Sequence, residues 1–184
     1  MQPYAVPRED VRARSACPLQ SRGQAVRFSS EGMKEFEETV VRYPIRQAAV
    51  LPALWIAQRE FGWISTEVVE YVAGLCDLAP SHVYGVVSFY TMFNRAPVGR
   101  FHLQLCTNIS CQLMGAEEVL ARLEEKLGVR LGGTTEDNQF TLIEVECLAA
   151  CEMAPMIQVN DEFIGPLTPD SAAALVDRLR QGGR

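Results

Sequence analysis

Residues 101–111 read FHLQLCTNISC, an alternation of apolar and polar residues that leads directly into two cysteines. The apolar side chains at 101, 103 and 105 would face one side of an extended chain, and the polar ones at 102 and 104 the other. This pattern predicts a half-buried strand. The strand would deliver Cys106 at its C-terminal end, and Cys111 follows after four further residues.

Residues 141–151 read TLIEVECLAAC and repeat this arrangement. They predict a second strand over 141–146, which delivers Cys147, with Cys151 shortly after it. The ends of adjacent strands lie on one edge of a sheet. The two cysteine pairs are therefore expected to meet, although about 35 residues separate them.

The rest of the C-terminal half predicts a small α+β unit after a turn-rich linker at residues 94–99. A helix is expected over 115–127, a polar loop over 132–138 and a hairpin between 156 and 163. Thr168-Pro169-Asp170 has the residues of a helix start: an N-cap, a proline in the first turn and an acidic side chain.

The N-terminal half predicts a helical bundle over residues 31–95. Apolar residues recur at helical spacing in four segments, near 33–41, 48–61, 66–75 and 80–90. Residues 1–30 are mildly basic and contain several prolines, so we expect a disordered tail there. This tail has no continuous apolar segment of the secretory kind.

Composition excludes some classes of function. The net charge is −6, and an acidic balance disfavours a nucleic-acid partner, because phosphate binding needs a positive field. No stretch approaches the roughly 20 apolar residues that span a bilayer, so no direct membrane insertion is expected. Structural disulfides are a poor explanation for six cysteines in a chain without a secretory signal.

Three chemistries remain open for the two cysteine pairs. A [2Fe–2S] cluster takes two thiolates on each of two irons, whereas structural zinc takes four thiolates on one ion. A thiol-exchange protein usually carries Cys-x-x-Cys at a helix start, and that motif is absent.

Of the other candidates, Cys76 is interpreted as a small buried hydrophobe and Cys17 as a free thiol. His82 and His102 are interpreted as surface or packing residues.

Three longer stretches carry a family resemblance: RYP at 42–44 with LPAL at 51–54 and AQREFGWI at 57–64; VYGVVSFYTMF at 83–93 with PVGR at 97–100; and the cysteine region, with GAEE at 115–118, FTL at 140–142, ECL at 146–148, AP at 154–155 and LTP at 167–169. Together they resemble the thioredoxin-like [2Fe–2S] subunit of respiratory NADH:quinone oxidoreductase, complex I. The resemblance covers about residues 31–180.

The resemblance implies a fold and a cofactor. The fold is a helical N-terminal domain, residues 31–95, followed by a thioredoxin-like [2Fe–2S] ferredoxin domain, residues 99–184. It implies one [2Fe–2S] cluster, whose ligands would be Cys106, Cys111, Cys147 and Cys151. Ala149 stands where this family usually has glycine, and alanine does not readily take a positive φ. Asn138 also replaces a usual glycine, and asparagine tolerates the left-handed region.

The resemblance also implies a function. The chain would be an electron-transfer subunit of an NADH dehydrogenase and translocase, with no active site of its own. Its partners would be a flavoprotein subunit that binds FMN and NADH, and a further iron–sulfur subunit of the peripheral arm. It would lie in the cytoplasm on the inner face of the membrane, or on the matrix side in a mitochondrion. Related subunits serve NAD-linked hydrogenases and formate dehydrogenases.

Overall fold

The computed structural model describes residues 26–182, which divide into two compact units between Pro97 and Val98. Most of the expected disordered tail, residues 1–25, lies outside the described part of the chain. Its last five residues need a correction, because Ser30 already begins a helix and Phe28 is buried. None of the helices within 26–182 is long and apolar enough to cross a membrane.

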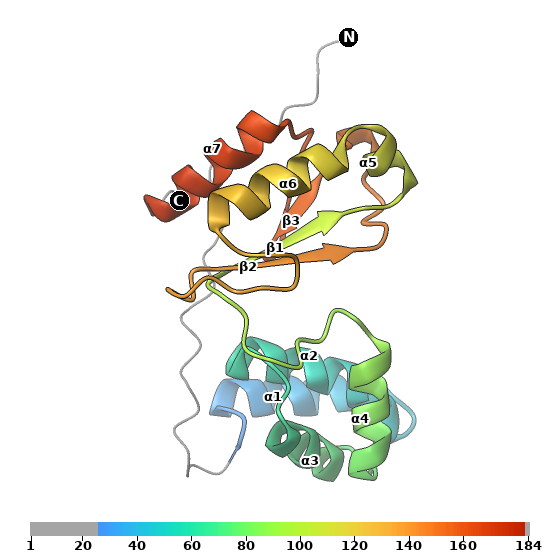
Figure 1. The fold of residues 1–184 in the computed structure, drawn as a ribbon. Coiled ribbons are helices and arrows are strands. Elements are labelled where there is room, and N and C mark those ends of the chain that lie inside the picture. The colour runs from blue at the N-terminus through green and yellow to red at the C-terminus, as the bar shows by residue number, and fades with distance from the viewer. Residues whose placement is uncertain (1–25, 183–184) are drawn as a thin grey trace. The chain divides into compact units, whose positions relative to one another are not determined.

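The first unit is helical, as the periodicity predicts (Figure 1). Each expected helix is present, and a 3-10 turn precedes the second one. The elements are α1 (Ser30–Val40), η1 (Arg46–Ala49), α2 (Val50–Phe61), α3 (Thr66–Leu75) and α4 (Pro80–Phe89).

The helix boundaries of this unit follow from local chemistry. The Ser65 hydroxyl accepts a hydrogen bond from the Val68 N–H at 3.3 Å and caps α3. Pro80 opens α4 in the first turn, where its missing N–H leaves no helical bond unmade. α2 ends at Gly62, which takes the left-handed conformation that glycine adopts without steric conflict.

The aromatic side chain of Phe28 explains why the chain is ordered before residue 31. Its ring lies 5.1 Å from that of Tyr71 and 6.0 Å from that of Phe61, centroid to centroid. Its backbone N–H also donates to the Tyr71 hydroxyl at 3.0 Å. Burial of one large ring is enough to hold a short segment against the bundle. The charge and proline content of the tail does not reveal this contact.

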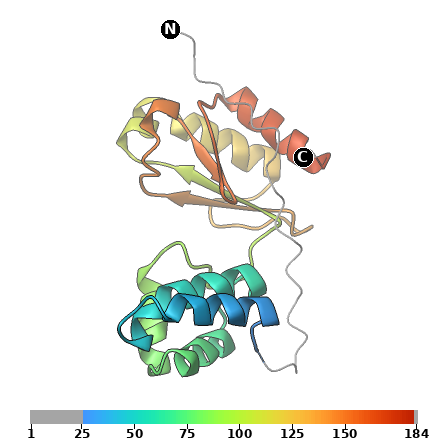
Figure 2. The ribbon, with the colours of Figure 1, turned by 180° about the vertical axis from the view of Figure 1, so that it is seen from behind.

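The second unit is a four-stranded sheet with two long helices on one face (Figures 1 and 2). The sheet order is β2-β1-β3-β4; β1 and β2 are parallel, and the other neighbours are antiparallel. The elements are β1 (Phe101–Cys106), α5 (Ile109–Leu113), α6 (Ala116–Leu127), β2 (Phe140–Val145), η2 (Cys151–Met153), β3 (Ile157–Val159), β4 (Glu162–Ile164) and α7 (Pro169–Arg180).

The core of this unit lies between the sheet and the helices α6 and α7. Leu103 and Leu105 of β1, Leu123 of α6 and Leu179 of α7 are all 2% exposed or less. The Thr168 hydroxyl accepts the Ser171 N–H, and the Ser171 side chain accepts the Thr168 N–H. This capping box fixes the start of α7.

The prediction of a half-buried strand at residues 101–105 is wrong. β1 lies in the middle of the sheet, and His102, expected on its polar face, is 4% exposed. Its backbone N–H donates to the Asn160 side chain at 2.9 Å, which lies in the turn between β3 and β4. Five of the six residues of β1 are buried, so the alternation in the sequence does not correspond to an exposed face. The expectation that His102 is a packing residue agrees with this burial.

Candidate metal centre

The parallel pairing of β1 and β2 brings the two cysteine segments together. Cys106, the last residue of β1, is in register with Val145, the last residue of β2. The Thr107 N–H donates to the Val145 carbonyl at 3.2 Å and continues the ladder past the strand end. Cys147 follows two residues later. The expected meeting of the two strand ends is therefore observed.

Cys111 lies on α5, which the sequence reasoning did not predict. This helix has only five residues, and no side chain caps its N-terminus. Its weak signal was the Asn108 that precedes it, a residue type common at N-caps. The helix turns Cys111 inward, so that Cys106 and Cys111 are 3% and 2% exposed.

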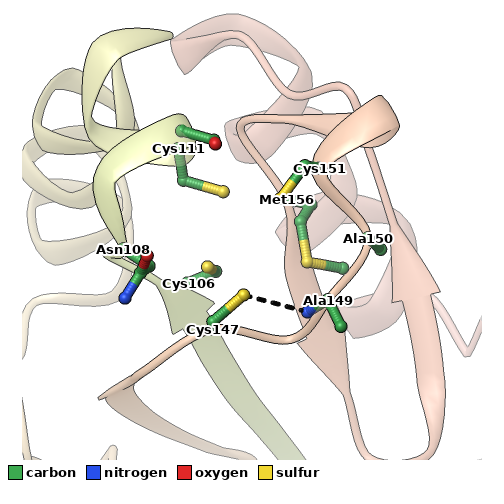
Figure 3. Close-up of a pocket in the computed structure, with 9 residues that line it drawn as sticks. Cys106, Asn108, Cys111, Cys147, Ala149, Ala150, Cys151 and Met156 are labelled. Atoms are coloured by element: carbon green, nitrogen blue, oxygen red, sulfur yellow. Dashed lines mark hydrogen bonds between the residues drawn. The ribbon is translucent and has the colours of Figure 1, made fainter.

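The sulfur atoms of all four cysteines point into one pocket (Figure 3). One pair comes from the β1–α5 segment and the other from the loop after β2. All four are free thiols, and Cys147 and Cys151 are exposed. The walls between them are mostly small or apolar. The remaining lining residues are Asn108, Ser110, Ala149, Ala150 and Met156.

The donor set fits a cluster better than a single ion. A tetrahedral zinc site needs four donors around one ion, whereas a [2Fe–2S] core takes thiolates in pairs on two separated irons. Two soft thiolate pairs facing each other across a pocket have the second arrangement.

Burial affects the acidity of the cysteines in this pocket. Loss of hydration, together with the neighbouring Cys106 thiol, raises the pKa of Cys111 to about 11. Without a metal, Cys111 is therefore a protonated thiol at neutral pH. Metal binding must displace that proton, as it does for any thiolate ligand.

The loop after β2 has an unusual backbone. Ala149 has a φ of +57°, and its N–H donates to Cys147 Sγ at 3.3 Å (Figure 3). The family resemblance raises the question whether alanine can occupy this position. The structure shows that it takes the left-handed conformation there. Asn138 does the same in its turn, with a φ of +54°.

Two acidic residues flank the second cysteine pair. Glu146 and Glu152 are both exposed. Water and salt screen exposed charges, so their effect on the electrostatic potential in the pocket is reduced.

His82 is also exposed and, like His102, does not line the pocket. Cys76 is fully buried in the helical unit, as predicted, and burial raises its pKa to about 11.

Comparisons with known proteins agree with this geometry. The model of the family "Thioredoxin-like [2Fe-2S] ferredoxin" matches residues 36–180. A subunit of the NADH-quinone oxidoreductase of Rhizobium meliloti is 48% identical over 82% of this chain and 90% of its own length. NADH-quinone oxidoreductase subunit 2 of Thermus thermophilus is 44% identical over 85% of this chain and 88% of its own.

A solved structure supports the fold. An NAD⁺-reducing [NiFe]-hydrogenase in the air-oxidized state has a chain that matches with a TM-score of 0.65 and 18% identity. The match covers 73% of this chain but only 23% of that one, so it shows shared architecture alone. The family match and the identity to the two oxidoreductase subunits decide the assignment. This chain belongs to the thioredoxin-like [2Fe–2S] ferredoxin family, in the branch that contains these subunits of NADH-quinone oxidoreductase, and its cofactor is the [2Fe–2S] cluster of that family.

Proposed function

We propose that this chain is an electron-transfer subunit of NADH-quinone oxidoreductase, and that four cysteines hold its [2Fe–2S] cluster. The observation that supports this most strongly is the pocket itself, which four free thiols from two strand ends line together. The relatives at 44–48% identity are named as subunits of the same oxidoreductase. The proposed ligands are Cys106, Cys111, Cys147 and Cys151.

In this proposal each cysteine pair binds one iron. When bound, the cluster accepts and passes on one electron at a time. The chain supplies an asymmetric environment for it. Cys106 and Cys111 are buried and keep water away from one side, whereas Cys147 and Cys151 leave the other side open.

The proposed partners are a flavoprotein subunit that binds FMN and NADH, and a further iron–sulfur subunit. The names of the two relatives described above support a subunit role. The helix α5 also presents Ile109 and Leu113, which are 71% and 81% exposed, beside the buried Cys111. Exposed apolar side chains next to a redox centre suit a protein partner. We place the complex on the cytoplasmic face of the membrane, or on the matrix side in a mitochondrion.

The cofactor proposal is tested by EPR of the anaerobically purified chain after dithionite reduction, with iron, sulfide and zinc counted on the same sample. We expect a rhombic S = 1/2 signal and about two irons and two sulfides per chain. A colourless sample that contains zinc, and that takes up no iron on anaerobic reconstitution, would show a structural zinc module instead. A colourless sample without any metal after the same treatment would leave the thiol-exchange alternative.

The partner proposal needs a separate measurement. The loaded chain is mixed with a purified flavoprotein subunit, and reduction of the cluster by NADH is followed by EPR. We expect reduction only when both chains are present, because the proposal assigns the binding of NADH and FMN to the flavoprotein. A Cys76→Ala variant is the matched control, since this buried cysteine lies outside the pocket. Reduction by NADH without the flavoprotein would contradict the division of roles.

A further inference from the structure

Ala149 occupies a backbone conformation that its side chain disfavours. Its φ is +57°, and in this region the Cβ of an L-residue comes too close to the following carbonyl oxygen. Four non-glycine residues within 26–182 have a positive φ. Three of them, Asp77, Asn138 and Asn160, are of the types that visit this region most readily. Ala149 is the exception among these four residues.

The backbone N–H of Ala149 is hydrogen-bonded to a cysteine. The Ala149 N–H donates to Cys147 Sγ at 3.3 Å, and both residues line the pocket (Figure 3). A left-handed residue within a tight loop turns backbone N–H groups toward one side, and such concave arrangements bind anions, among them iron–sulfur sites. Cys147 is exposed as a residue, while its sulfur points into the pocket.

We propose that Ala149 is a positioning residue, whose backbone N–H donates to Cys147 Sγ and thereby raises the reduction potential of the cluster. This inference rests on the proposed function. Hydrogen bonds to the sulfurs stabilise the reduced, more negative form. The pair formed by Cys106 and Cys111 lies in a buried environment of its own, so the Ala149 N–H acts on the exposed pair.

The test removes this single N–H and leaves the side chain unchanged. Cys147 allows the synthesis, because residues 1–146 can be ligated as a thioester to a synthetic segment 147–184 that begins with cysteine. In one product, L-lactic acid replaces Ala149, so that an ester oxygen stands where the N–H was. In the matched control, lactic acid replaces Ala174, an exposed alanine of α7 in the same segment. Each full-length chain is loaded with iron and sulfide and titrated under EPR.

The expected result is a shift in the reduced fraction. At the potential where half of the unmodified chains are reduced, we expect the ratio of reduced to oxidised cluster to be about threefold to tenfold lower with the ester at 149. The ester at 174 should leave the ratio unchanged. An Ala149→Gly variant keeps the N–H, and we expect its ratio to stay within about twofold of the unmodified chain. Equal ratios for the two ester variants would overturn the inference.

A second measurement covers the case in which the ester at 149 does not load. The synthetic segment of the unmodified chain carries ¹⁵N at Ala149 alone, and pulsed EPR of the reduced protein reads its coupling to the cluster. A resolved ¹⁵N coupling supports the hydrogen bond, and its absence contradicts it. An unmodified chain with no [2Fe–2S] signal defeats the proposed function, whereas a normal signal with an unshifted ester variant defeats only the role of Ala149.

Discussion

Asn160 gives a prediction that separates backbone strain from hydrogen bonding. It is 2% exposed and has a φ of +56° in the turn between β3 and β4. Its side-chain oxygen accepts the His102 N–H at 2.9 Å, and its side-chain nitrogen donates to the Arg100 carbonyl at 3.2 Å. The side chain therefore ties the turn to the beginning of β1, the strand that ends at Cys106.

We expect Asn160→Ala to reduce the free energy of unfolding of this unit by about 3 kcal/mol. Leaving the buried His102 N–H without its partner accounts for about 1–2 kcal/mol, and the left-handed backbone adds about 1–2 kcal/mol for a residue with a Cβ. Asn160→Gly loses the same side-chain hydrogen bonds but avoids the cost of the left-handed backbone. It should therefore be less destabilising than the alanine variant by about 1 kcal/mol.

The assay is native-state hydrogen exchange of the β1 amides, because a chain with two compact units need not unfold in one step. Asn138 is the control, since it has a φ of +54° but an exposed side chain. At position 138 the alanine variant should again have a free energy of unfolding about 1 kcal/mol lower than the glycine variant, and the glycine variant should be nearly as stable as the wild type. Equal effects of alanine and glycine at both positions would refute the strain argument. A loss below about 1 kcal/mol for both Asn160 variants would refute the hydrogen-bond argument.

Three further predictions concern other parts of the molecule. Burial raises the pKa of the folded Cys76 thiol to about 11, so the unfolded wild-type chain ionises first and its free energy of unfolding falls by up to about 2–3 kcal/mol between about pH 9 and 11. Cys76→Ala should flatten this pH dependence. A wild-type urea series without the fall would contradict the prediction. Gly165→Ala places a Cβ against the carbonyl oxygen of Met153, which is close to Cys151 in the chain. This variant should lower the free energy of unfolding by about 1–3 kcal/mol and speed the loss of iron. Its control, Gly74→Ala on open α3 surface, should instead stabilise by about 0.5–1 kcal/mol in the same urea titration. Ser65→Ala removes the cap of α3 and should lower the exchange protection of its first turn by about 1 kcal/mol; unchanged protection would show that the cap is not needed.

The long elements could be predicted from the sequence because their signals are local. Apolar periodicity located α1 to α4, α6 and α7, and the residues at their starts, such as Ser65 and Thr168, are caps in the structure. The alternation at 101–105 and the strand expected at 141–146 also gave the meeting of Cys106 and Cys147, since both strands end at the same edge. These conclusions needed only the periods of helix and strand and the habit of parallel neighbours.

The remaining features depend on contacts between distant residues. The burial of His102, whose backbone N–H is bonded to the side chain of Asn160 58 positions away, is not revealed by the alternation of β1. The order at Phe28 depends on the Tyr71 ring, 43 positions away. The inward turn of Cys111 depends on α5, a helix too short to show a period. The family resemblance leaves open whether Ala149 can take a positive φ, and the backbone geometry shows that it does.

The positions of the cysteines in the metal site depend on the register between β1 and β2. Cys106 is in register with Val145, and a slip of β2 by a single residue would turn its side chains to the opposite face. The apolar side chains of β2 that fix this registry, Phe140 and Leu142, are therefore as necessary to the site as the sulfurs, although neither lines the pocket. The polar loop at 132–138 lies at the start of β2, at the far end of the strand from Cys147. Natural insertions of several residues should accumulate in that loop, while the length of the segment from 140 to 151 should remain constant.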